Sequence, residues 1–82
     1  MIPLTLREIA SIVDGTLADA TGDEQVTGPS FVDSRYAVSE GLFVAVVGEH
    51  VDGHDFAADA VSAGAAAALT TRPVGVPAVV VG

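Results

Sequence analysis

The feature that most constrains the fold is a run of six apolar residues, LFVAVV at 42–47, which Gly48 closes. A continuous apolar run of this length is typical of a central strand buried on both faces of a sheet. A helical pattern follows over 55–64, and further apolar runs over 65–71 and 77–82 predict two more strands. A strand–helix–strand unit normally joins parallel strands by a right-handed crossover. The sequence therefore predicts an α/β fold, with a small mixed, partly parallel sheet flanked by helices.

Two amphipathic helices are expected. The apolar face of the helix over 55–64 consists of Phe56, Ala60 and Ala63, with Ala57 and Val61 beside it, and Gly64 is placed to end it. An earlier helix has the capping-box spacing of Thr5 and Glu8, the staple positions Leu4 and Ile9, and a stripe of Leu6, Ile9, Ala10 and Val13. Gly15 is expected to end that helix.

Short strands are expected between the first helix and the apolar run. Residues 16–19, TLAD, read as a short edge strand. Another strand is expected near Phe31 and Val32, and Pro29 indicates that its start lies at a sheet edge.

Length and charge limit the possible functions. The 82 residues predict a single domain over 1–82 that contains no cysteine and carries a formal charge of −8. Its only cations are Arg7, Arg35 and Arg72, which argues against binding nucleic acid or an anionic membrane surface. No targeting segment or membrane span is visible, so a cytoplasmic location is expected. The apolar run that ends at Gly82 has no polar tail, which suggests a piece of a longer protein.

The segment GEHVDGHDF at 48–56 holds the densest group of chemically active side chains. His50, Asp52, His54 and Asp55 could together bind zinc or iron. The simpler interpretation is local: Asp52 and Gly53 form a turn, and either Asp52 or Asp55 caps the following helix. His50 follows the carboxyl end of the apolar strand, where open α/β sheets bind ligands.

The triplet DSR at 33–35 is a second candidate. Ser34 offers a hydroxyl and Arg35 a planar guanidinium, and both suit a phosphate or a base edge. Alternatively, Asp33 and Arg35 form an ordinary surface pair. Ser34 lacks the elbow motif of a nucleophile, and no phosphate-binding loop with a lysine is present. We therefore expect no catalysis by these residues alone.

Together, residues 31–69 resemble the amino-terminal domain of the peptidoglycan Mur ligases. The shared pattern is a DSR triplet, a turn, an LFVA strand, a glycine, a DGHDF loop and a helix ending in GA-A. The DGHDF form and the short start are most similar to MurF-type members, which add D-alanyl-D-alanine to a UDP-N-acetylmuramoyl-tripeptide. MurE-type members, which add the third peptide residue, share much of the pattern.

The resemblance implies a function for each candidate. In this family the first of three domains holds the UDP end of the UDP-N-acetylmuramoyl-peptide, and the central domain binds ATP and magnesium. The implied UDP contacts are Val32, Ser34, Arg35, Glu49, His50 and Val51. Val32 would line the uracil pocket, and Ser34 would hydrogen-bond the ligand. The acidic Glu49 departs from what a nearby diphosphate favours.

Three alternatives stay open. The chain could be the same domain of a MurE-type ligase, or a structural module with no ligand affinity of its own. It could also be a metal-binding module at HVDGHD. The implied partners are the UDP-linked muramoyl peptide and the central ATPase domain of the same chain.

Overall fold

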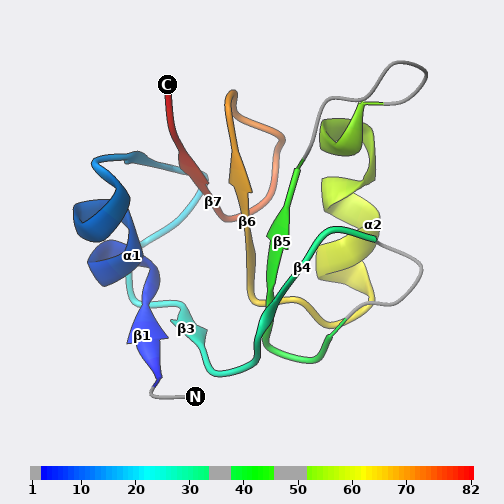
Figure 1. The fold of residues 1–82 in the computed structure, drawn as a ribbon, viewed down its shortest axis with the longest axis horizontal. Coiled ribbons are helices and arrows are strands. Elements are labelled where there is room, and N and C mark those ends of the chain that lie inside the picture. The colour runs from blue at the N-terminus through cyan, green and yellow to red at the C-terminus, as the bar shows by residue number, and fades with distance from the viewer. Residues whose placement is uncertain (1–2, 34–37, 46–51) are drawn as a thin grey trace.

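Five strands form one mixed sheet in the order β2–β7–β6–β5–β4 in the computed structural model, which describes residues 3–33, 38–45 and 52–82 (Figure 1). The strands are β2 (Thr16–Ala18), β4 (Ser30–Phe31), β5 (Leu42–Val44), β6 (Ala67–Thr70) and β7 (Ala78–Val80). Strands β4, β5, β6 and β7 are parallel, whereas β2 is antiparallel to β7 at the opposite edge from β4. The predicted mixed, partly parallel α/β sheet and the edge position of 16–19 are confirmed.

Two helices cover opposite faces of this sheet. The helix α1 (Leu6–Val13) packs in one cluster with Ala67 and Val79, and α2 (Ala57–Ser62) packs in another with Ala68 and Ala78. Neighbouring residues of a strand point to opposite faces, so the two clusters lie on either side of the sheet. Figure 1 shows the resulting three layers, with α1 on the left and α2 on the right.

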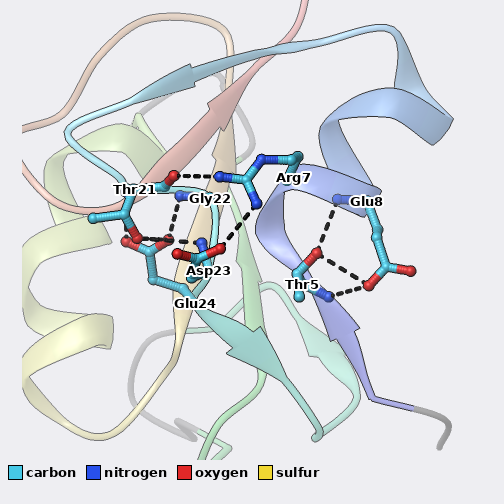
Figure 2. Close-up of polar contacts among 7 residues, drawn as sticks. All are labelled: Thr5, Arg7, Glu8, Thr21, Gly22, Asp23 and Glu24. Carbon is cyan, nitrogen blue, oxygen red and sulfur yellow. Dashed lines mark hydrogen bonds and ion pairs between the residues drawn. The ribbon is translucent and has the colours of Figure 1, made fainter.

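The start of α1 is fixed by the capping box that the sequence predicts. The Thr5 hydroxyl accepts a hydrogen bond from the Glu8 backbone N–H at 3.2 Å, and the Thr5 N–H donates to Glu8 Oε1 at 2.9 Å (Figure 2). The Thr5 N–H bond lowers the pKa of the Glu8 carboxyl. Leu6, Ile9 and Ala10 are buried as expected, but Val13 is 39% exposed, so the predicted stripe ends one turn early.

A polar junction beside α1 was not predicted. Two short strands, β1 (Leu4–Thr5) and β3 (Gln25–Val26), pair antiparallel in a separate small sheet. Before β3, Arg7 reaches Asp23 Oδ1 at 2.8 Å and the Thr21 carbonyl at 2.9 Å (Figure 2). Arg7 therefore holds the 21–23 turn against the helix.

The second half follows the predicted strand–helix–strand order with one correction. Strand β5 lies inside the sheet between β4 and β6, as the apolar run predicts, and β6 is the middle strand of the five. The apolar face of the second helix differs from the prediction, since Ala57 and Ala60 are buried while Phe56 is 39% exposed and Ala63 is exposed. The reason is that 53–56 form a 3-10 turn, η2 (Gly53–Phe56), before α2 begins. A 3-10 turn has three residues per turn, so an α-helical period does not place Phe56 correctly.

Gly15 has a different role from the predicted one. Asp14 and not Gly15 adopts the left-handed conformation after α1, with φ of 56°, and its N–H donates to the Ala10 carbonyl. Gly15 lies against β7, where a Cβ would stand 2.6 Å from Val79 Cγ1 and 2.9 Å from the Val80 carbonyl oxygen. Close packing, and not a left-handed turn, therefore requires glycine at this position.

Gly15→Ala should destabilise the domain by about 1–3 kcal/mol, because the added methyl group forces α1 and β7 apart. Gly82→Ala is the matched control, since nothing lies within 4 Å of a Cβ there. Urea unfolding followed by circular dichroism measures both. Equal stability of the two variants would contradict the packing role of Gly15.

Candidate functional site

The candidate site is the end of the sheet where the carboxyl ends of the parallel strands lie, which we call the candidate edge or carboxyl edge. Strands β5, β6 and β7 run in the same direction, and their carboxyl ends lie at the top of Figure 1. Open α/β sheets bind ligands outside such ends. Val32 follows β4 at this edge, Asp52 precedes η2, and Thr71 and Arg72 follow β6.

Of the predicted UDP contacts, only Val32 belongs to the described residues. This residue is 64% exposed directly after β4, so an apolar residue faces solvent at this edge. Ser34, Arg35, Glu49, His50 and Val51 lie outside the described residues, as does the alternative pairing of Asp33 with Arg35. Their roles stay predictions.

Asp52 is the N-cap of η2 and the centre of a hydrogen-bonded network. Its Oδ1 accepts from the His54 backbone N–H at 2.9 Å and lies 2.6 Å from His54 Nδ1. Its Oδ2 lies 2.9 Å from Arg72 Nη2. Of the two capping residues that the sequence allows, Asp52 is therefore the correct one, and Asp55 is not the cap.

His54 joins the segment before α2 to the segment after β6. The residue is 5% exposed, and its Nε2 accepts a hydrogen bond from the Thr71 backbone N–H at 2.9 Å. Because a backbone N–H can only donate, Nε2 must carry a lone pair. The arrangement therefore corresponds to a neutral ring whose Nδ1 proton is donated to Asp52.

These bonds leave His54 unsuited to bind a metal. One ring nitrogen is committed to Asp52 and the other accepts from Thr71, so a metal could bind only if one of these bonds broke. Among residues 3–33, 38–45 and 52–82, no group of three or more histidine, cysteine or acidic side chains is placed to hold a metal. His50 lies outside those ranges.

The hydrogen-bonded network favours the ionised form of Asp52 and so lowers its pKa. The His54 backbone N–H, followed by the His54 ring and Arg72, lowers the pKa of Asp52 from 3.8 to about 2. Each of these groups donates to the charged carboxylate and so favours it over the protonated form. Arg72 remains half exposed, with 50% of its side chain accessible, while the Asp52 side chain is 29% exposed.

An apolar hollow of about 160 Å³ lies elsewhere on the domain. Ser30 and Leu42, the first residues of β4 and β5, contribute to its lining together with Leu4, Ile9, Val26 and Gly28. It therefore opens at the amino ends of these strands, away from the candidate edge. Its nearly nonpolar lining offers little to a charged nucleotide.

Comparison with known proteins decides the family. The profile described as "Mur ligase family, catalytic domain" matches residues 31–82. The chain belongs to the Mur ligase family. It is 52% identical over 85 residues to the UDP-N-acetylmuramoyl-tripeptide–D-alanyl-D-alanine ligase of Mycobacterium tuberculosis, covering 99% of this chain and 17% of that relative.

Two further Mur ligases are informative. A crystal structure of MurF from Acinetobacter baumannii superimposes with a TM-score of 0.79 at 29% identity, over 96% of this chain and 18% of that one. A UDP-N-acetylmuramoyl-L-alanyl-D-glutamate–2,6-diaminopimelate ligase from Halalkalibacterium halodurans is 52% identical, over 61% of this chain and 11% of its own length. The chain thus spans less than a fifth of these Mur ligases, and the resemblance to MurF-type members is confirmed.

Arg72 and Thr71 are the site residues that the sequence analysis missed. They lie 20 and 19 positions beyond Asp52, and no motif connects them to it. The available signal was position alone, because both directly follow a predicted buried strand. Only the pairing of β5 with β6 brings them beside Asp52 and His54.

The lowered pKa of Asp52 predicts how stability depends on pH. Because the folded state favours the carboxylate, Asp52 contributes stability that is fully present above its ordinary pKa of 3.8 and lost as the pH falls through about 2. Asp52→Asn should therefore flatten the dependence of unfolding free energy on pH in this acidic range. Urea unfolding at a series of pH values measures the slope.

Asp55→Asn is the matched control for this prediction, since it removes the same charge from an exposed neighbouring position. The network interpretation is wrong if both variants change the acidic slope equally.

Proposed function

We propose that this chain is the UDP-binding amino-terminal domain, over residues 1–82, of an ATP-dependent ligase that adds D-alanyl-D-alanine to UDP-N-acetylmuramoyl-tripeptide. The observation that carries the proposal is the 52% identity over 99% of the chain to a ligase with that name. In the fold, the candidate edge supports it, because this edge is where sheets of this type bind nucleotides.

The proposed ligand would lie across the carboxyl ends of β4, β5 and β6. Val32 is exposed directly after β4 and offers an apolar contact for the uracil ring. Ser34 and Arg35 would supply hydrogen bonds, and residues 49–51 would contact the nucleotide partly through backbone groups. A chain of net charge −8 repels a diphosphate at long range, so local donors must hold it.

Chemistry would take place in the rest of the ligase. ATP and magnesium would bind to its central domain, where the peptide carboxylate would take the terminal phosphoryl group of ATP and release ADP. The amine of D-alanyl-D-alanine would then displace phosphate from this acyl phosphate. This domain would contribute binding energy at a remote part of the substrate, which positions the reacting carboxylate.

We propose a cytoplasmic location. Within the described residues, no helix is long and apolar enough to cross a membrane.

A MurE-type ligase is the second candidate. The observation in its favour is the 52% identity to the diaminopimelate ligase of Halalkalibacterium halodurans, although that match covers only 61% of this chain. Both candidates bind the same UDP end, so they predict the same behaviour for this domain.

A chimera tests the function directly. This chain replaces the segment of about 85 residues that it matches in the Mycobacterium tuberculosis ligase. We expect ATP-dependent joining of D-alanyl-D-alanine to UDP-N-acetylmuramoyl-tripeptide, with a KM for the UDP substrate within about tenfold of the parent, because a domain that supplies the same UDP contacts should change the binding free energy by no more than roughly 1.4 kcal/mol. A folded chimera that cannot be saturated with the UDP substrate would overturn the proposal.

Titration of the isotope-labelled chain with UDP tests the site. We expect saturable NMR shifts in the amides of Val32, Ser34, Arg35 and residues 49–51, and none around the apolar hollow. Unchanged spectra at millimolar UDP, with the fold intact, would support the alternative of a structural module without ligand affinity of its own. Parallel addition of zinc tests the metal alternative at HVDGHD.

A further inference from the structure

Arg72 is one of the few cations of a strongly acidic chain, and an ion pair with Asp52 holds its side chain. The whole chain contains eleven acidic residues and three arginines. Of the arginines, Arg7 binds the 21–23 turn beside α1. Arg72 lies two residues beyond β6, at the carboxyl ends of the parallel strands. Among the described residues it is the cation at the candidate edge.

The Asp52 carboxylate that holds Arg72 is itself held by His54. Asp52 uses Oδ1 for the backbone and ring nitrogens of His54, which leaves Oδ2 to meet Arg72 at 2.9 Å. The side chain of His54 is 1% exposed, and its other ring nitrogen, Nε2, accepts a hydrogen bond from the Thr71 N–H. An ordinary surface ion pair has two mobile partners, whereas here the carboxylate is held by a buried group.

The exposure of the two partners shows which one faces solvent. Half of the Arg72 side chain is accessible, against 29% for Asp52 and 1% for His54. Accessibility therefore rises along the network from the buried imidazole to the guanidinium. A guanidinium carries five N–H donors in a planar fork and can hold a carboxylate while donating to a phosphate oxygen.

We propose that Arg72 binds the phosphate groups of the nucleotide ligand, and that Asp52 and His54 are positioning residues that aim its guanidinium at the carboxyl edge of the sheet. This deepens the proposed function and rests on it, because it names the group that holds the diphosphate. It also explains how a chain of charge −8 binds an anion, since one fixed cation acts at short range where the net charge is outweighed.

The test compares UDP with uridine, which lacks the phosphates, on the 82-residue chain. Arg72→Gln should weaken UDP binding roughly ten- to hundredfold, the loss expected for charge-assisted hydrogen bonds, and leave uridine binding unchanged. Arg72→Lys should fall between, because an ammonium keeps the charge but loses the fork. The dependence of UDP affinity on salt should also become weaker in Arg72→Gln.

Arg7→Gln is the matched control, since it removes the same charge from the junction beside α1 (Figure 2). We expect its UDP affinity to equal that of the wild type. Asp52→Asn tests the positioning role and should weaken UDP binding without affecting uridine. Amide spectra of every variant establish that the fold is intact.

The outcomes separate this proposal from the function on which it rests. If the wild type binds UDP but Arg72→Gln binds it equally well, Arg72 has no ligand role and the proposed function stands. Equal losses for UDP and uridine in Arg72→Gln, or equal losses of UDP affinity in Arg72→Gln and Arg7→Gln, would also overturn the phosphate contact. If the wild type binds neither UDP nor uridine, this proposal and UDP binding by the domain fail together.

Discussion

The burial of β6 on both faces, with three of its four residues buried, is the constraint on which the rest of the domain depends. Ala67 packs in the cluster beneath α1, Ala68 packs in the cluster beneath α2, and neither has any exposed surface. Strands β5 and β7 pair with β6 from either side, so the parallel part of the sheet is organised around it. Thr71 and Arg72 therefore continue directly from the most enclosed strand of the fold.

The polar network extends this order beyond the sheet. His54 lies 17 positions before Thr71, yet one ring joins the segment that begins η2 to the segment that ends β6. Hydrogen bonds in a partly buried place are worth more than their exposed counterparts, because the alternative is an unsatisfied donor or acceptor. The His54 ring thus connects the segment before α2 to the segment after β6 at the carboxyl ends of the parallel strands.

Sequence reasoning succeeded where the determinants are local and failed where they depend on register. Thr5 and Glu8 are three positions apart, so the capping box could be predicted, and continuous apolar runs identified the parallel strands. The pairing of Asp52 with Arg72 depends on how β5 and β6 align, which no local pattern contains. Strands β1 and β3 have two residues each and show no periodicity. For the candidate site, position after a strand indicated the carboxyl ends of the parallel strands, but not the hydrogen-bonded network formed there.

The alanines between α2 and the sheet have a consequence for how this domain can change during evolution. Ala57 and Ala60 of the helix meet Ala68 and Ala78 of the strands, and all four are fully enclosed. Methyl groups on both sides let a helix approach a sheet closely, so any larger side chain must displace α2. The turn that carries Asp52 and His54 leads directly into this helix. Replacement of these alanines by larger residues would therefore move the turn at the carboxyl edge, although none of the four alanines lies at that edge.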